Sequence, residues 1–167
     1  MALTPTHPDH DAQQTMRAFL TAARLLSEQL GQELRRESDM SQIHYELLAW
    51  LAESPGHRLG MTELARRTGV STSRLSHLAD RLEQRGWIRR LAGPTDRRVH
   101  LAQLTDTGRN ALAEAAPWHA ECAHTRLMDH LTPDQLDQLR DISELLRHRL
   151  TGRSPTPTAG ESRPTGP

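Results

Sequence analysis

Residues 61–78 read MTELARRTGVSTSRLSHL, and the spacing within this segment predicts two short helices joined by a tight turn. Ala65 is small at the point where two helices must approach each other, and Gly69, four residues later, can adopt the left-handed backbone of a turn. The apolar residues after the turn are spaced to face a core: Val70, Leu75 and Leu78. The segment therefore predicts a helix-turn-helix, with helices over about 62–67 and from 71 or 72 to about 85.

The second of these helices carries hydrogen-bonding side chains at the positions that do not face the core. Hydroxyl side chains, arginine and histidine crowd its first turns, where free backbone amides also favour an anion. Such side chains reach phosphate oxygens and base edges, and arginine bound to guanine is the commonest specific contact in DNA recognition. We therefore expect a DNA recognition helix, with these contact residues: Ser71, Thr72, Ser73, Arg74, Ser76, His77 and Arg81.

A β-hairpin is predicted directly after this helix. Two alternating segments, 87–91 and 99–104, are separated by a turn that begins with GPTD at 93–96. The tip of this turn carries two arginines, and a wing would place them against a narrow minor groove, whose negative potential attracts arginine. An acidic residue beside them is expected to hold one of them through a charge-assisted hydrogen bond. The residues expected to act at the wing tip are Arg97 and Arg98, with Asp96 as their support.

Helical segments precede and follow this module. Residues 11–36 carry apolar side chains at steps of three and four along one helical face, and a second helix begins near Ser41. After the hairpin, Thr105 can cap a long helix that reaches about 130 and that Pro117 should kink or divide. A threonine followed by Pro133 predicts the start of a last amphipathic helix.

The helices at the two ends of the chain are more leucine-rich than a small winged domain needs for its own core. We expect them to pair between subunits in a two-fold homodimer; the alternative is a monomer in which they pack on the middle. The expected fold is mainly α with a small β-hairpin wing, a winged helix-turn-helix flanked by N- and C-terminal dimerisation helices. Its expected parts are a disordered tail at 1–10, a dimerisation helix at 11–36, a DNA-binding lobe at 41–104, dimerisation helices at 105–150 and a disordered Pro/Thr/Gly-rich tail at 151–167.

The formal net charge of the chain is +0, but its charges are unevenly distributed. Residues 58–98 contain ten arginines and four acidic residues, whereas the segments on either side carry net negative charge. A basic segment of this kind neutralises phosphates and releases counterions, while acidic flanks favour solubility. This distribution favours double-stranded DNA as the partner; a solvated arginine-rich surface is the alternative.

Composition and motifs argue against several other classes of protein. No segment approaches the roughly 18 consecutive apolar residues of a membrane span, and MALTPTHPDH at 1–10 lacks the features of a secretory signal, so we expect a cytoplasmic protein without membrane contact. The single cysteine, Cys122, cannot form an internal disulfide. The chain has no Gly-rich phosphate loop, no HExxH and no G-x-S-x-G motif, so we expect neither an enzyme nor a cofactor.

These motifs resemble those of the multiple-antibiotic-resistance regulator (MarR) family of bacterial winged-helix proteins. The family's wing pattern, Asp-x-Arg followed by an apolar strand and Leu-Thr-x-x-Gly, is present as DRR at 96–98 and LTDTG at 104–108. LEQRGWI at 82–88 and the order of the helices match as well, over about 11–150. The resemblance implies a homodimer built from the first and last helices, which places two recognition helices in successive major grooves of a pseudo-palindromic operator. It also implies that Arg98 is the wing-tip arginine supported by Asp96, and Arg97 remains a candidate for phosphate contact.

The resemblance further implies control of DNA binding, and we expect a repressor. Family members commonly lose DNA affinity when a small aromatic or anionic molecule binds between the dimer helices and the winged lobe. The residues that could form an aromatic wall and a polar anchor here are Arg17, His44, Tyr45, Trp118 and His119, with structural packing as their alternative role. Alternative hypotheses are redox control through Cys122, metal control through His119 and Cys122 with His124 and His44, and an interaction module that does not bind DNA.

Overall fold

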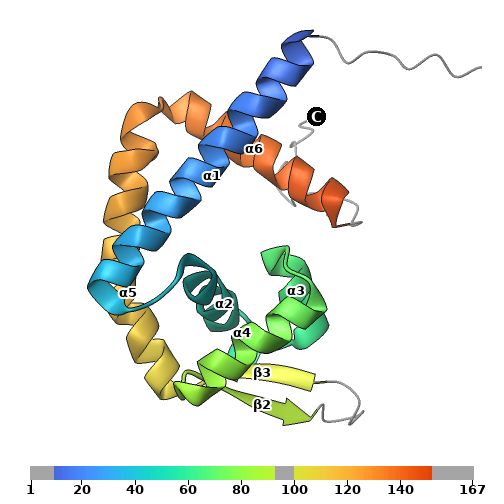
Figure 1. The fold of residues 1–167 in the computed structure, drawn as a ribbon, viewed down its shortest axis with the longest axis vertical. Coiled ribbons are helices and arrows are strands. Elements are labelled where there is room, and N and C mark those ends of the chain that lie inside the picture. The colour runs from blue at the N-terminus through green and yellow to red at the C-terminus, as the bar shows by residue number, and fades with distance from the viewer. Residues whose placement is uncertain (1–9, 93–99, 152–167) are drawn as a thin grey trace, which may run out of the picture. The chain divides into compact units, whose positions relative to one another are not determined.

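Helices make up most of the part of the chain that the structure describes, which is residues 10–92 and 100–151. The structure is a computed structural model (Figure 1). Its helices are α1 (His10–Ser38), α2 (Gln42–Ala52), α3 (Met61–Thr68), α4 (Thr72–Gln84), α5 (Asp106–Arg126) and α6 (Pro133–Leu150), with 3-10 turns η1 (Pro55–His57) and η2 (Met128–His130). Its strands are β1 (Arg58–Gly60), β2 (Ile88–Ala92) and β3 (His100–Leu104). The expected fold class, mainly helical with a small sheet, is confirmed.

Gly69 and Ser71 form the turn between α3 and α4. Gly69 has φ 68° and ψ 15°, in the left-handed region where a glycine is favoured. Ser71 caps α4, because its side-chain oxygen accepts a hydrogen bond from the backbone N–H of Arg74 at 3.2 Å. The predicted helix-turn-helix is therefore confirmed, and its helix boundaries differ from the expected ones by about one residue.

The three strands form one antiparallel sheet in the order β1-β3-β2. Strands β2 and β3 form the expected hairpin, with Ile88 opposite Leu104 and Ala92 opposite His100. The third strand, β1, pairs with β3 through Arg58 opposite Gln103 and was not expected from the sequence. Its length of three residues is too short to display an alternating pattern. The turn of the hairpin, 93–99, lies outside the described residues.

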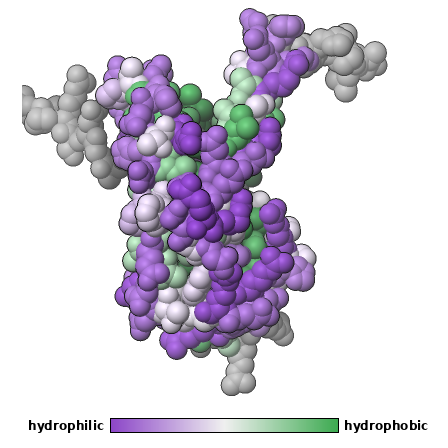
Figure 2. Space-filling model, turned by 60° about the vertical axis from the view of Figure 1, so that its left-hand side comes forward, coloured by the Kyte–Doolittle hydropathy of each residue, from purple (hydrophilic) through white to green (hydrophobic). Residues whose placement is uncertain are grey.

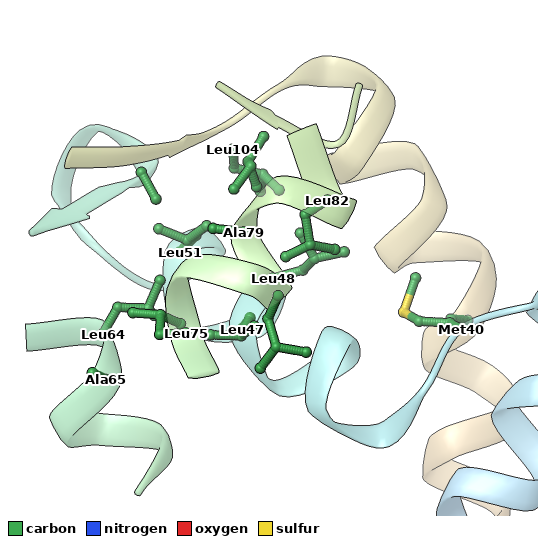
Figure 3. Close-up of a cluster of buried hydrophobic side chains, with 14 of the residues drawn as sticks. Met40, Leu47, Leu48, Leu51, Leu64, Ala65, Leu75, Ala79, Leu82 and Leu104 are labelled. Carbon is green, nitrogen blue, oxygen red and sulfur yellow. The ribbon is translucent and has the colours of Figure 1, made fainter. Parts of the chain in front are cut away.

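The hydrophobic core of the winged-helix lobe is arranged around α2 (Figure 3). Leu47, Leu48 and Leu51 are fully buried on α2, and α4 contributes a buried face of its own. The other residues labelled with them come from other segments of the chain: Met40, Leu64, Ala65, Leu75, Ala79, Leu82 and Leu104. Full burial of one leucine stabilises a fold by about 1.5–3 kcal/mol. This packing fixes which side of α4 faces inward, so the opposite side of the helix faces solvent.

Thr105 and Gly108 join the hairpin to α5. The Thr105 hydroxyl donates to the carbonyl oxygen of Gly86 at 2.6 Å and accepts from the N–H of Gly108 at 3.0 Å. The Thr105 N–H donates to the carbonyl oxygen of Trp87 at 3.1 Å. A Cβ built on Gly108 would overlap that same oxygen, so only glycine fits at this position. These contacts give the Leu-Thr-x-x-Gly pattern a structural reason.

Helix α5 packs along α1 and also contacts α2. It runs through Pro117 as one helix, so the expectation that Pro117 divides it is wrong; a proline removes only one N–H donor from the helix. It ends at Arg126, earlier than expected, and η2 covers the residues from Met128 to His130. On α1, the following large apolar residues are exposed: Met16, Phe19, Leu20 and Leu25.

The chain divides into a unit that ends at His130 and a second unit that begins at Leu131 and contains α6. The start of α6 is confirmed as predicted, with Pro133 in its first turn and a capping box between Thr132 and Gln135. Helix α6 exposes four large apolar side chains: Ile142, Leu145, Leu146 and Leu150. No helix among the described residues is both long and apolar enough to cross a bilayer.

Candidate nucleic-acid interface

The outward side of α4 is a continuous exposed polar surface, which we call the α4 outer face. It consists of the predicted contact residues Ser71, Thr72, Ser73, Arg74, Ser76, His77 and Arg81, all of them exposed. The helix is held by its cap and by its buried side, so this face is presented on a rigid support. Within the described part of the chain, Arg74 and Arg81 have no acidic partner. Their charges are therefore available to an external anion.

The arginines of α3 differ, because they are paired within the helix. Glu63 accepts hydrogen bonds from Arg66 at 2.6 and 2.8 Å and from Arg67 at 2.8 Å. These bonds lower the pKa of Glu63 from 4.5 to about 2. The guanidinium carbon of Arg67 also lies 5.0 Å from the ring centre of Trp50. Much of the basic charge of α3 is thus neutralised by the protein itself.

Arg90 connects the base of the wing to α4. From β2 its guanidinium donates to the carbonyl oxygen of Ser76 at 2.8 Å and forms an ion pair with Asp80 at 2.7 Å. Its backbone N–H donates to Glu83 at 3.0 Å. The partners of Arg90 span two turns of α4, so α4 and strand β2 are held at a fixed spacing.

Arg85 connects the end of α4 to the segment between α1 and α2. Its guanidinium donates to the carbonyl oxygen of Asp39 at 2.8 Å and to the carboxylate of the same residue at 2.9 Å. The guanidinium carbon also lies 4.7 Å from the ring centre of Trp87. This arginine therefore ties the end of α4 to the segment that precedes α2.

A surface hollow lies beside the α4 outer face, between the first turns of α2 and α4, and we call it the α2–α4 groove. Its described polar lining residues are Ser41, His44, Ser71, Ser73, Arg74, His77 and Arg81. His44 is buried, with 8% of its surface exposed. Burial lowers the pKa of His44, the charges of Arg85 and Arg81 lower it further, and Asp39 opposes them.

The predicted wing residues Asp96, Arg97 and Arg98 lie outside the described residues. The strands on either side place the hairpin next to α4, since Arg90 of β2 contacts Ser76. The wing assignments therefore rest on the sequence pattern.

The residues expected to bind an effector do not form one group. Tyr45 and His119 come together from α2 and α5, with ring centres 4.1 Å apart and planes 14° from parallel. The side-chain amide of Gln42 lies 3.3 Å from Nε2 of His119. Burial lowers the pKa of His119 and is the main reason that the pKa of Tyr45 is raised.

The other three candidates lie elsewhere. His44 belongs to the α2–α4 groove, and Trp118 is 40% exposed on α5. Arg17 lines shallow hollows formed by α1 residues alone. The separation of His44 from Tyr45 follows from helix geometry, since consecutive residues on an α-helix point about 100° apart.

The histidines and the cysteine do not form a metal site in the described part of the chain. There, no group of three or more potential ligands comes together around His119 and Cys122 or anywhere else. Cys122 itself is buried, with 8% of its surface exposed. Neither observation favours the metal and redox alternatives.

Sequence reasoning missed two elements of this interface, the Arg90 contacts and the α2–α4 groove. Arg90 is separated from Ser76 by 14 positions, and Arg85 from Asp39 by 46, so the pairs become visible only in the folded chain. The sequence does contain one signal for the groove: both α2 and α4 begin at an N-cap serine, Ser41 and Ser71. Two helix N-termini in one lobe can meet at one surface.

Comparison with known proteins identifies relatives that cover most of the chain. A family model described as the MarR family matches residues 38–99. The crystal structure of Sco3205, a MarR family transcriptional regulator from Streptomyces coelicolor in complex with DNA, has 39% sequence identity and a TM-score of 0.81, covering 89% of this chain and 93% of that one. The structure of AbsC, a MarR family regulator from the same organism, has 33% identity and a TM-score of 0.77, with coverage of 92% and 99%.

Curated proteins with established names also include relatives of this chain. The transcriptional repressor MprA of Escherichia coli K12 is 31% identical over 118 residues, which is 71% of this chain. The match spans 66% of MprA and about half of other curated relatives, such as the repressor YetL of Bacillus subtilis at 48%. These relatives are named as transcriptional regulators rather than as enzymes. The helix-turn-helix, the hairpin and the Thr105–Gly108 junction agree with this relationship. Because Sco3205 and AbsC share at least 33% sequence identity with this chain over nearly their full lengths, this chain belongs to the MarR family of transcriptional regulators.

Proposed function

We propose that this chain is one subunit of a homodimeric transcriptional repressor that binds a pseudo-palindromic DNA operator and is released by a small aromatic or anionic ligand. The observation that carries the proposal is the α4 outer face, where a rigid helix presents exposed hydroxyls together with Arg74 and Arg81, which have no acidic partner among the described residues. Such a face suits the major groove, since arginine reads guanine and hydroxyls reach phosphates. A regulator of this kind acts in the cytoplasm, where its operator lies.

The relatives support DNA as the partner and repression as the effect. Sco3205 was crystallised in complex with DNA, and it is 39% identical to this chain. MprA and YetL are both named as repressors. On this reading, Ser71, Arg74 and their neighbours on α4 contact the operator. Arg97 and Arg98 reach the flanking minor groove or backbone, with Asp96 supporting Arg98.

Exposed apolar side chains support a dimer. Phe19 and Leu20 of α1 are 46% and 56% exposed, and α6 exposes a leucine-rich surface of its own. Figure 2 shows hydrophobic patches that interrupt an otherwise largely hydrophilic face. Exposed apolar surface of this extent on helices is typical of an interface with a second subunit. We propose that α1, α5 and α6 form the dimer interface, as the domain layout 11–36 and 105–150 implies.

The effector site is proposed at the contact of Tyr45 with His119. This stack joins α2 of the DNA-binding lobe to α5, so a ligand that displaced one ring would alter the spacing of the two helices. Gln42 and His119 offer hydrogen bonds to a phenol or carboxylate. Arg17 and Trp118 are proposed to contribute only if the dimer brings them to this site.

The test is a fluorescence titration of purified protein on the DNA that flanks its own gene, with random DNA as the control, at several salt concentrations. We expect tight, saturable binding by a dimer, which weakens steeply as salt rises because phosphate contacts release counterions. The dimer is checked by light scattering in the same buffer. Binding that never exceeds that of random DNA, both here and in a selection of fragments from the whole genome, would refute the proposed function.

The same assay then tests release. Phenolic carboxylates are added to the protein–DNA complex, and wild type is compared with Tyr45→Ala. We expect release of wild type and a weaker ligand response of the variant, because the variant already lacks the stack that a ligand would displace. A metal ion or an oxidant that releases the DNA when phenolic carboxylates do not would favour the alternative effectors.

A further inference from the structure

The described residues that line the α2–α4 groove include arginines, histidines and serines but no acidic residue. Two helices begin at it, α2 with 11 residues behind its cap Ser41 and α4 with 13 residues behind its cap Ser71. Arg74, His77 and Arg81 line it from α4, and none of its described lining residues is acidic. Free amides at helix N-termini and arginine side chains both favour an oxyanion. The groove therefore has the chemistry of an oxyanion-binding site.

His44 provides a second and independent observation. Its side chain forms part of the groove lining and is only 8% exposed. Both of its ring nitrogens are buried, and neither has a hydrogen-bond partner among the described residues. Folded proteins leave few buried polar atoms unpaired, and those that remain often belong to a site that another group completes.

The charges around His44 explain how a bound anion would act on it. Burial is the largest cause of its lowered pKa, followed by the charges of Arg85 at the end of α4 and Arg81 within α4. Asp39, from the connection between α1 and α2, acts in the opposite direction. His77 and Arg74 of α4 face the same groove. An anion placed here would offset the arginine charges that disfavour a positively charged imidazole.

We propose that the α2–α4 groove binds a backbone phosphate of DNA and that His44 takes up a proton when this phosphate arrives. The occupant is a DNA phosphate rather than a free anion because Ser73, Arg74 and His77 belong both to the groove and to the α4 outer face. DNA that lies along this face passes the mouth of the groove. The inference rests on the proposed function and adds to it a defined backbone contact and a proton-linked step.

The experiment measures DNA affinity as a function of pH for wild type, His44→Gln and the control His130→Gln, which removes an exposed histidine of η2 outside the groove and the α4 outer face. The probe is a duplex recovered from random DNA by selection with the wild-type protein. From about pH 8 to about pH 6, wild-type affinity should rise toward the limit of about tenfold per pH unit that uptake of one proton allows. His130→Gln should retain this rise, whereas His44→Gln should lose it. Thermal unfolding checks that each variant is folded.

A second measurement needs no variant. Wild-type protein with labelled histidine is titrated by NMR, free and bound to the duplex, and the pKa of the His44 imidazole should rise on binding. A duplex with a neutral methylphosphonate at the contacted position should bind with a smaller rise. Inorganic phosphate alone serves as the free-anion probe and should shift the His44 signal only weakly.

The outcomes separate the inference from the proposed function. Failure to select any duplex, with binding no better than to random DNA, contradicts the proposed function. Specific binding with the same pH dependence in wild type and His44→Gln, or an unchanged His44 pKa in the complex, overturns the inference alone. A His44 signal that responds to inorganic phosphate but not to the duplex also overturns it, because the groove would then be a small-anion site.

Discussion

The α4 outer face and the surface formed by α3 and β2 lie in the same basic segment, yet they use arginine differently. On α4, Arg74 and Arg81 have no acidic partner in the described part of the chain. On α3 and β2, Arg66, Arg67 and Arg90 are bound to carboxylates of the protein. The net charge of a segment therefore does not measure how much charge it offers to DNA. Only the unpaired arginines should release counterions on binding.

The largest expected effect comes from removing an unpaired arginine. Arg74→Ala should lower operator affinity by about tenfold to hundredfold and reduce discrimination against random DNA, because a good arginine–base contact contributes about 1–3 kcal/mol. Its melting temperature should stay close to that of wild type, since the side chain is exposed and bonds nothing else in the described chain. Titration on operator and random duplexes measures both affinities.

Arg67→Ala is the matched control, because it removes the same charge from a paired position. Arg67 is bonded to Glu63 at 2.8 Å and packs on Trp50. We expect a smaller loss of affinity and a larger loss of stability than for Arg74→Ala. Equal losses of affinity from the two variants would contradict the distinction between paired and unpaired arginines.

The next effect concerns the contacts between β2 and α4. Arg90→Gln should lower the free energy of unfolding by about 1–3 kcal/mol, because it removes charge-assisted hydrogen bonds to Ser76 and Asp80. Operator affinity should fall modestly, while the slope of log affinity against log salt should stay unchanged, because the charge of Arg90 is already paired. Chemical denaturation and salt titrations measure these quantities.

Arg89→Gln controls for this second prediction. Arg89 is the adjacent arginine on β2, and it is exposed with one hydrogen bond to Gln103 at 3.0 Å. Its replacement should leave stability almost unchanged. A salt slope that falls with Arg90→Gln but not with Arg89→Gln would mean that Arg90 contacts phosphate directly.

The fold could be predicted closely because its signals are local. Gly69 marks the turn between two helices. Four N-cap side chains each accept a hydrogen bond from a backbone N–H that the first turn of a helix would otherwise leave unpaired: Ser41, Ser71, Thr105 and Thr132. These signals act within four residues of the chain and do not depend on the rest of the molecule. By contrast, strand β1 forms by pairing with the distant strand β3, where Arg58 lies opposite Gln103. The sequence around β1 therefore contains no local pattern that predicts it.

The candidate site was predicted only in outline for the same reason. Which residues of α4 face outward followed from helical spacing, whereas the state of each arginine depends on partners brought close by folding. The contact of Arg85 with Asp39 and the stack of Tyr45 on His119 both join distant segments. His44 was grouped with Tyr45 as one wall of a pocket, but the turn of α2 directs it to the groove beside α4.

The smallest expected effect comes from releasing the paired arginines of α3. The pKa of Glu63 is lowered from 4.5 to about 2, so its ion pairs stabilise the protein above about pH 4.5 and this contribution is lost as pH falls toward about 2. Because Glu63 is 34% exposed, solvent screens the pairs, and Glu63→Gln should reduce stability by no more than about 1 kcal/mol at neutral pH. Denaturation midpoints of the two proteins should converge in acid.

Glu63→Gln also converts Arg66 and Arg67 from paired to unpaired cations without altering the α4 outer face. If pairing is what withholds their charge from DNA, the variant should bind random duplex slightly more tightly than wild type and show a steeper salt dependence. Operator affinity should rise by the same small factor, so that discrimination stays constant. An unchanged salt slope in Glu63→Gln would mean that the position of α3, rather than the pairing of its arginines, keeps them from the DNA.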